Sequence, residues 1–284
     1  MGPARPVPGS SRDQSETVDV IVVALHWLTS SAHGASSVFE RDLRAQRRQW
    51  PVVLSGFFEP LFYLLSLGVG VGALVHGMKL PDGRVVGYAA FVAPAMLAAS
   101  AMNGAISEST FNVYGKLTWA KLYDGVMATP VAPVDVALGE IGWALARGLL
   151  YAAAFLALMA IMGLTRSWWA VLALPAAVLV GLAFAAIGMT FTTYVRAWQD
   201  FDWSLAAIFV MFLFSGTFAP ISAYPLPVQL AVLAMPLSHG VELIRGLTTG
   251  SAPWTLLGHA AYLLAVAGLG LAFAGRRMTK LLYK

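Results

Sequence analysis

Six apolar segments constrain the fold of this chain more than any other feature of its sequence. They lie at about residues 53–76, 86–107, 141–164, 168–192, 202–219 and 254–274. A hydrocarbon core of about 30 Å needs roughly 20 apolar residues in a helix, because only a helix or a closed barrel satisfies the backbone hydrogen bonds there. The composition agrees, with 58% hydrophobic and 11% charged residues. The sequence therefore predicts an all-α integral membrane protein with six transmembrane helices.

The apolar stretch between the fifth and sixth segments has a different character. It is interrupted by prolines at four positions, Pro220, Pro225, Pro227 and Pro236. Proline removes a hydrogen-bond donor and clashes with the preceding helical turn, so this stretch is not one straight span. We expect a re-entrant helical hairpin, which is tolerated at membrane depth where protein or a water-filled cavity surrounds it.

The basic residues indicate the orientation. Six crossings place both termini on one side, and with that side cytoplasmic, fourteen of the 18 Lys and Arg residues lie inside. The four that fall outside are Lys79, Arg84, Arg166 and Arg245. This bias follows the positive-inside rule. We therefore expect cytoplasmic termini, with a disordered tail at 1–17 and a basic C-terminus at 276–284, and an extracellular position for the hairpin.

Residues 18–50 are expected to lie at the membrane surface. The apolar run that begins at Val18 resembles a signal peptide, but it is preceded by acidic residues where positive charge is expected, and it is too short to span. "SSVFERDLRAQRRQW" follows and predicts an amphipathic helix. Val38, Phe39, Leu43 and Trp50 would face lipid, and the arginines, among them Arg44 and Arg47, would meet anionic headgroups. A merely solvated basic run is the alternative for the individual arginines.

Glu59 and Pro60 stand inside the first apolar segment, close to its cytoplasmic end. A carboxylate at that depth costs less than one at mid-membrane, but it still needs a partner or water. Two interpretations remain open: an inward-facing acid on a transport path or subunit interface, and a helix-end acid at the headgroups. Pro60 is expected to kink the helix.

The longest polar insertion on the inner side is "SESTFNVYGKLTWAKLYDGVMATPVAPVDVALGE", from Ser107 to Glu140. Its residues 111–128 predict a helix that ends at Thr129-Pro130. One face carries the apolar side chains of Phe111, Tyr114, Leu117, Leu122 and Met127, and other faces carry Lys116, Lys121 and Asp124. Apolar side chains facing the cytosol suit docking into a groove of a partner protein, and a helix lying on the membrane surface is the alternative.

Motifs of catalysis and of ATP hydrolysis are missing from the sequence. The phosphate-binding pattern G-x-x-x-x-G-K-[ST] is absent, since the single Gly-Lys pair, Gly115-Lys116, is followed by Leu117. Cysteine is absent and the five histidines show no paired metal spacing, so we expect no catalytic residue, metal or cofactor in this chain. The spans carry charge only near their ends, at Glu59, Arg147 and Asp202, which disfavours an ion-coupled transporter or a membrane enzyme. Nucleic acid is not an expected partner, because the basic residues flank apolar segments.

Four segments resemble the permease subunits of ABC-2 type exporters, most closely the NodJ-like branch of nodulation-factor and daunorubicin-type drug exporters. They are "FFEPLFYLLSLGVGVG" with its basic amphipathic lead, "YDGVMATPVAPVDVALGE", "FLFSGTFAPISAYPLP" and "MPLSHGVELIRGL". The resemblance implies a transmembrane domain over 51–275 in the cell (plasma or inner) membrane. It also implies a homodimer with two copies of a separate ATPase, which binds the ATP and Mg.

The resemblance further implies roles for particular residues. The segment with Phe111, Tyr114, Lys116, Lys121 and Asp124 resembles the cytoplasmic coupling helix that receives the ATPase motion. Arg44, Arg47, Glu59 and Pro60 would lie at the cytoplasmic interface. Pro220, Pro236, His239, Glu242 and Arg245 would belong to the extracellular gate, where Glu242 and Arg245, three apart on a helix, could pair. The implied function is export of a lipid-like, glycolipid or drug-like amphiphile; export of a polysaccharide is the alternative within the family.

Overall fold

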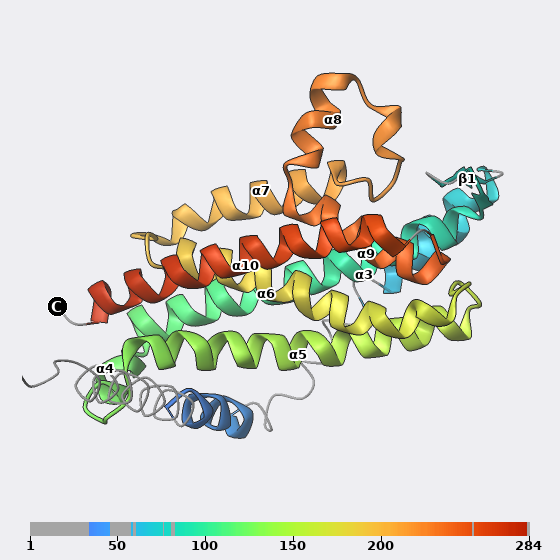
Figure 1. Cartoon of the computed structure of the whole chain (residues 1–284). Helices are drawn as coiled ribbons and strands as arrows, with labels where there is room; N and C mark the ends of the chain where they lie inside the picture. Colours follow the sequence, from blue (N-terminus) through green and yellow to red (C-terminus); the bar gives the residue numbers. More distant parts are fainter. Residues whose placement is uncertain are drawn as a thin grey trace, which may run out of the picture.

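A computed structural model describes residues 34–45, 58, 61–75, 77–80, 83–251 and 253–282. Its centre is a bundle of long helices that run side by side (Figure 1). They are α3 (Tyr88–Ser107), α5 (Pro133–Ile161), α6 (Ala173–Thr192) and α10 (Pro253–Leu282). The alanine-rich helix α6 lies in the middle and packs against the other three.

Shorter elements complete the chain. A helix at residues 34–45 precedes the bundle. The other elements, in chain order, are η1 (Leu64–Gly70), η2 (Val71–Ala73), β1 (Met78–Lys79), β2 (Val85–Val86), η3 (Glu108–Asn112), η4 (Gly115–Trp119), α4 (Leu122–Val126), η5 (Trp168–Leu172), η6 (Trp198–Asp200), α7 (Phe201–Phe214), η7 (Ile221–Ala223), α8 (Leu226–Leu233) and α9 (Pro236–Thr249). The two strands pair antiparallel, with Met78 opposite Val86.

Small side chains let the central helices approach closely. A Cβ added at Gly270 of α10 would lie 2.8 Å from the Cβ of Ala186 in α6, and one at Gly240 of α9 would lie 2.7 Å from Cγ2 of Val180. Membrane helices gain little from the hydrophobic effect between themselves, so close van der Waals packing of small residues holds them together. Phe184 of α6 is fully buried among these contacts.

The described residues contain four helices that are long and apolar enough to cross a membrane: Tyr88–Trp119, Pro133–Ile161, Trp168–Thr192 and Trp254–Leu282. They correspond to the predicted second, third, fourth and sixth spans. The predicted first span lies partly outside the described residues, which retain an apolar helical piece, Leu61–Ala73. The predicted fifth span contains α7, whose 14 residues rise about 21 Å. Six crossings therefore stay a prediction.

The interrupted stretch is a pair of short helices, as its prolines predict. Helices α8 and α9 meet at a bend of 83°. The prolines lie at helix starts, where the missing N–H costs nothing: Pro225 is the N-cap of α8 and Pro236 is the first residue of α9. Pro220 likewise precedes the short helix η7. Figure 1 shows α8 standing away from the bundle, joined to it through α9.

Different elements lie at the two ends of the bundle. The helix at 34–45, α4 and the C-terminal end of α10 lie at one end, and β1 lies at the other (Figure 1). Near β1, the Arg84 guanidinium donates to Thr249 O (3.0 Å) and the Arg166 amide to Thr248 O (2.9 Å), both at the end of α9. Three of the four basic residues expected outside, Lys79, Arg84 and Arg166, thus lie together, opposite the end that carries α4 and the C-terminus.

Three boundaries differ from the sequence predictions. Helix α5 begins at Pro133, two turns before the predicted start at residue 141, because Pro133 suits a first helical position and the Asp135 carboxylate accepts from the Ala132 amide (3.0 Å). The second span continues through η3 and η4 to Trp119. Residues 276–282 are the last turns of α10 and not a separate tail.

Candidate functional site

Five side chains form an ionic cluster at the end that carries α4: Arg41, Asp42, Lys116, Tyr123 and Glu140. Arg41 Nη2 donates to Asp42 Oδ1 (3.0 Å) and Glu140 Oε1 (2.8 Å). Lys116 Nζ donates to Asp42 Oδ2 (2.9 Å) and Glu140 Oε2 (2.6 Å). The Tyr123 hydroxyl donates to Glu140 Oε1 (2.9 Å). The ionic cluster joins the helix at 34–45, η4, α4 and α5.

The acids of the ionic cluster are buried and its charges balance. Asp42 is 5% and Glu140 4% exposed, and two cations face these two carboxylates. Burial alone would lower the pKa of Arg41, but the carboxylates of Asp42 and Glu140 outweigh it and raise that pKa above its ordinary value. Burial, with the Glu140 charge, raises the pKa of Tyr123 well above its ordinary value, so its hydroxyl stays a donor. The cluster is a built connection between four elements.

The amphipathic helix packs on α5 more closely than the sequence predicts. Val38, expected to face lipid, is 4% exposed, and a Cβ added at Gly139 would lie 2.6 Å from its Cβ. Phe39, with the same expectation, packs edge-on against Trp143 of α5, with ring centroids 5.8 Å apart. The apolar face of this helix therefore covers α5, to which the ionic cluster also connects it. Only Leu43 stays exposed among the predicted lipid contacts of the described residues.

The predicted coupling segment is two pieces and not one helix over 111–128. The first piece is the end of the helix Tyr88–Trp119, and the second is α4. Lys121 separates them with a positive φ of 46°. The first piece stays helical through Ser109 and Thr110. Their hydroxyls donate to carbonyls one turn back, Ala105 O (2.7 Å) and Ile106 O (2.6 Å), so these polar side chains have partners within the helix.

Phe111 and Tyr114 pack inward and not toward the cytosol. Their ring centroids lie 4.6 and 5.2 Å from that of Phe201 at the start of α7. Tyr114 is buried and Phe111 half-buried, so neither offers the free apolar side chain that was expected for docking. Trp119 and Trp198 instead stack at the rim of this aromatic group, with centroids 5.2 Å apart, and both are exposed.

The remaining predicted coupling residues fall into two classes. Lys116 is occupied within the ionic cluster. Lys121 and Asp124 are exposed on α4 and its approach. The structure therefore brings Lys116, Lys121 and Asp124 to one end of the bundle, but it leaves only Lys121 and Asp124 accessible to a partner.

Of the predicted cytoplasmic interface, Arg44 lies among the described residues. It is exposed and pairs with Glu40 one helical turn away (2.5 Å). Arg47, Glu59 and Pro60 lie outside the described residues, as does the 1–17 tail.

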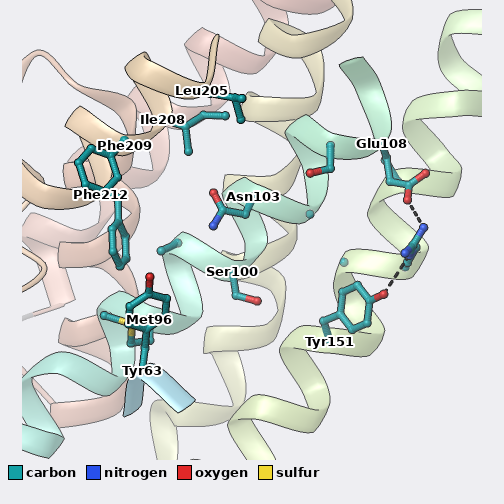
Figure 2. A pocket seen from close by; sticks show the side chains of 16 residues that line it. Tyr63, Met96, Ser100, Asn103, Glu108, Tyr151, Leu205, Ile208, Phe209 and Phe212 are labelled. Atoms are coloured by element: carbon teal, nitrogen blue, oxygen red, sulfur yellow. Dashed lines mark hydrogen bonds and ion pairs between the residues drawn. The ribbon is translucent and has the colours of Figure 1, made fainter. Parts of the chain in front are cut away.

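A cavity of about 530 Å³ lies between α3, α5 and α7. One wall is apolar and comes mainly from α7, with Leu205, Ile208, Phe209 and Phe212 (Figure 2). The opposite wall comes from α3, η3 and α5 and carries the polar side chains of the cavity, set among Met96 and small residues. These polar side chains are Ser100, Asn103, Ser107, Glu108, Arg147 and Tyr151. Leu205 and Phe209 are also 50% and 61% exposed, so the cavity reaches the surface of the molecule.

An ion pair forms the polar end of this cavity. Arg147 of α5 donates to Glu108 Oε1, and its Nε donates to the Tyr151 hydroxyl (3.0 Å). Asn112 donates to the other oxygen of Glu108 (2.5 Å). Arg147 was predicted near a span end, but it is the fifteenth residue of α5, because that helix begins early. The cavity charges are thus paired, whereas Asn103 of α3 points into the space (Figure 2).

The predicted gate residues lie at the junction of the hairpin with the bundle. Arg245 is 2% exposed and donates to Glu242 Oε1 (2.7 Å), which confirms that these two pair. It also donates to Phe91 O of α3 (3.2 Å) and to Gly216 O after α7 (2.7 Å), and its guanidinium lies 3.8 Å from the Phe91 ring centroid. Arg245 therefore connects α9 to both α3 and the end of α7. His239 contacts α10 instead, through His259.

Sequence reasoning missed Arg41, Asp42, Tyr123 and Glu140 as a cluster, and Glu108 as the partner of Arg147. Arg41 and Glu140 are 99 residues apart in the chain, and no local spacing relates them. One available signal was Pro133 followed by Asp135, which is typical of a helix start and would have placed Glu140 inside a helix.

Comparison with known proteins gives consistent matches. Residues 35–249 match the family described as "ABC-2 type transporter". The chain is 34% identical over 219 residues to nodulation protein J of Rhizobium leguminosarum bv. trifolii, covering 75% of this chain and 80% of that protein. It is 34% identical over 197 residues to nodulation protein J of Sinorhizobium fredii (68% and 72% covered) and 30% over 223 residues to that of Bradyrhizobium diazoefficiens (77% and 82%).

Proposed function

Because this chain belongs to the ABC-2 type transporter family, we propose that it is the permease subunit of an ATP-driven exporter whose cargo is an amphiphile. Members of this family are membrane transport components rather than enzymes. The proposal has three finer parts, which are the cargo, the source of energy and the oligomeric state.

The cavity between α3, α5 and α7 carries the proposal for the cargo. Its volume of about 530 Å³ falls within the range of small-molecule sites. Its two unlike walls match a molecule with an apolar part and a polar part, the apolar part lying against Phe209 and Phe212 and the polar part against Asn103 and the serines. Since Glu108 and Arg147 neutralise each other, an uncharged head rich in hydroxyl or amide groups fits better than an ionic one.

The end of the bundle that carries α4 is proposed to face the cytoplasm and receive energy from a separate ATPase. The chain lacks a phosphate-binding loop of its own. The ionic cluster connects the helix at 34–45, η4 and α4 to α5. A displacement of α4 by the ATPase would therefore move α5, which lines the cavity. Exposed Trp119, Lys121 and Asp124 offer the surface for that contact.

A second copy of the chain is proposed to cover the open side of the cavity. The outer face of α7 is apolar and exposed, at Leu205, Phe209, Val210 and Leu213. A cavity that contains the Asn103 amide and the Glu108–Arg147 ion pair is unfavourable against lipid tails, because the amide would have no hydrogen-bond partner there and even a paired charge is costly to expose to hydrocarbon. A homodimer closed across α7 would shield this space and make one path from two half-sites.

The test is transport by the permease reconstituted in liposomes with a candidate partner ATPase. The probes are a fluorescently labelled neutral glycolipid and the same lipid backbone with an anionic head. We expect ATP-dependent movement of the neutral probe, and loss of that movement in Phe209→Ser, which makes the apolar cavity wall polar.

The matched control is Leu264→Ser on α10, a residue as exposed as Phe209 (57% against 61%) but absent from the cavity lining. It should transport like the wild type. Equal transport by both variants would contradict the cavity as the cargo site. Preference for the anionic probe would contradict the assignment of an uncharged head.

A further inference from the structure

Two histidines contact each other where the hairpin meets the last helix, with their rings tilted by 57°. His239 of α9 and His259 of α10 have their Nδ1 atoms 2.8 Å apart. His239 Nε2 lies 2.9 Å from Leu233 O, and the His239 ring stacks on Tyr262, with centroids 3.9 Å apart and an angle of 14°. The transport proposal uses neither histidine.

These contacts satisfy the end of α8. The last carbonyls of a helix lack amide partners in a following turn, and at the bend between α8 and α9 the carbonyls of Val232, Leu233 and Ala234 each contact a side chain. Ser238 donates to Val232 O (2.8 Å), and the Tyr262 hydroxyl donates to Ala234 O (2.7 Å). The carbonyl of Leu233, between Val232 and Ala234 in the chain, contacts His239 Nε2. Tyr262 and the histidine pair therefore hold the bend of the hairpin on α10.

The partners fix where protons can sit. A carbonyl oxygen only accepts, so His239 Nε2 carries a hydrogen in every state that keeps the contact with Leu233 O. In the neutral pair His239 Nδ1 is then an acceptor, and His259 Nδ1 donates to it. One added proton is also accommodated, because a charged His239 donates from Nδ1 to a His259 whose own hydrogen has moved to Nε2.

A second proton is not accommodated. With both rings charged, both Nδ1 atoms carry hydrogens, no acceptor remains between them, and two positive charges face each other across 2.8 Å. The contact is therefore compatible with no added proton or one, and incompatible with two. Its stabilising contribution is present above the range in which free histidine titrates, about 6.5, and is lost as the pH falls below it.

Few other charges act on the pair. Glu242 of α9 lies close enough to interact with His259, but its carboxylate is already paired with Arg245. Tyr262 of α10 stacks on His239. Of the elements packed against α9, α6, α8 and η5 carry no titratable side chain, α3 carries Tyr88, and α7 carries Asp202 in its first turn. The site also lies near a span end, since His259 follows the exposed Trp254 by five residues, so protons can reach it.

We propose that His239 and His259 form a proton-sensitive latch between the α8–α9 hairpin and α10. The latch holds the hairpin on α10 while the pair carries no added proton or one. It releases the hairpin when both rings are charged. Arg245 keeps α9 on α3 in either state, so release frees the α8 side of the hairpin and not the whole of it. The latch makes the hairpin respond to acid on the side of the membrane where α8 lies, whatever the cargo is.

The latch can be tested by spin-label distances, because the chain contains no cysteine. Labels at Leu230→Cys on α8 and Leu269→Cys on α10 report the hairpin; both residues are exposed. In the full-length protein in lipid nanodiscs, we expect one short distance at pH 7.5 and loss of that population at pH 5.0. A pair at Leu150→Cys on α5 and Leu269→Cys is the control within the bundle and should not change.

The deciding variant is His259→Gln, which leaves one titratable ring and so cannot form the doubly charged pair. Its hairpin distance should be the same at both pH values. An unchanged wild-type distance would overturn the latch, and so would a His259→Gln protein that shifts like the wild type. If His259→Gln does not fold, His239→Gln provides the same comparison.

Discussion

Replacing Glu140 with glutamine removes the carboxylate that three side chains of the ionic cluster share. In the wild type, Glu140 accepts from Arg41, Lys116 and Tyr123 at 2.8, 2.6 and 2.9 Å. Glutamine keeps the shape of the side chain but brings no charge and one acceptor oxygen instead of two. Asp42 is then the single anion for two cations, and the contact between the helix at 34–45 and α5 weakens.

The size of the effect follows from the burial of the partners. Removing one member of a fully buried ion pair costs about 3–5 kcal/mol, and an exposed pair is worth about 0–1 kcal/mol. The Glu140 side chain is 3% exposed, whereas those of Arg41 and Lys116 are 29% and 23% exposed, so water still reaches the two cations. We expect a loss of about 2–3 kcal/mol in the docking of the helix.

Amide hydrogen exchange of residues 34–45 in the full-length protein measures this loss. If docking controls the opening of this helix, 2–3 kcal/mol corresponds to exchange that is roughly 30–140 times faster. The bundle helices α3 and α6 should exchange as in the wild type. The matched control is Glu40→Gln, since Glu40 pairs with Arg44 on the exposed face of the same helix, a contact worth about 0.3–0.5 kcal/mol.

Exchange in Glu140→Gln no faster than in Glu40→Gln would refute the account of the ionic cluster. It would mean that Val38 and Phe39 hold the helix by packing alone. Faster exchange spread evenly over all helices would also count against it, because the cluster is argued to act on one junction.

Two further predictions concern the hairpin and α4. Arg245→Lys should lower the Tm, because a lysine cannot reach Phe91 O, Gly216 O and Glu242 together. Each buried carbonyl left unpaired costs about 1–3 kcal/mol. Arg245→Met, of similar volume, should have a Tm no higher than that of the lysine variant. Thermal unfolding in detergent checks this, and a wild-type Tm for the lysine variant would contradict it. Charge reversal at Lys121 and Asp124 together should abolish co-purification of the partner ATPase while the permease still inserts into the membrane. Charge reversal at the exposed Arg166, at the other end of the bundle, should leave co-purification unchanged. Unchanged co-purification of the Lys121 and Asp124 variant would refute the role of α4.

Local features of the sequence predicted the parts of the fold that depend on neighbours in the chain. Apolar length located the helices at 88–107 and 168–192, and the prolines located the break between α8 and α9. The spacing of Glu242 and Arg245 predicted their contact. These inferences succeed because backbone hydrogen bonding in a membrane and helical periodicity are local constraints.

The functional contacts that the sequence did not reveal join distant segments. Glu108 and Arg147 are 39 residues apart, and the sequence predicts Arg147 near a span end and Glu108 in the polar insertion. The polar character of the run that begins at Ser107 predicts the end of the span there, but the hydroxyls of Ser109 and Thr110 donate to carbonyls within the helix and Glu108 pairs with Arg147. Once the helix continues to Trp119, Phe111 and Tyr114 fall against α7 instead of facing a partner.

The central claim is that the end of the bundle with α4 faces the cytoplasm, where an ATPase can act on it. Labelling of single cysteines with a membrane-impermeant maleimide tests it most directly, in the cysteine-free chain expressed in intact cells. Lys121→Cys should react only after the membrane is permeabilised, and Arg166→Cys should react in intact cells. Reaction of Lys121→Cys from outside, with protection of Arg166→Cys, would contradict the claim.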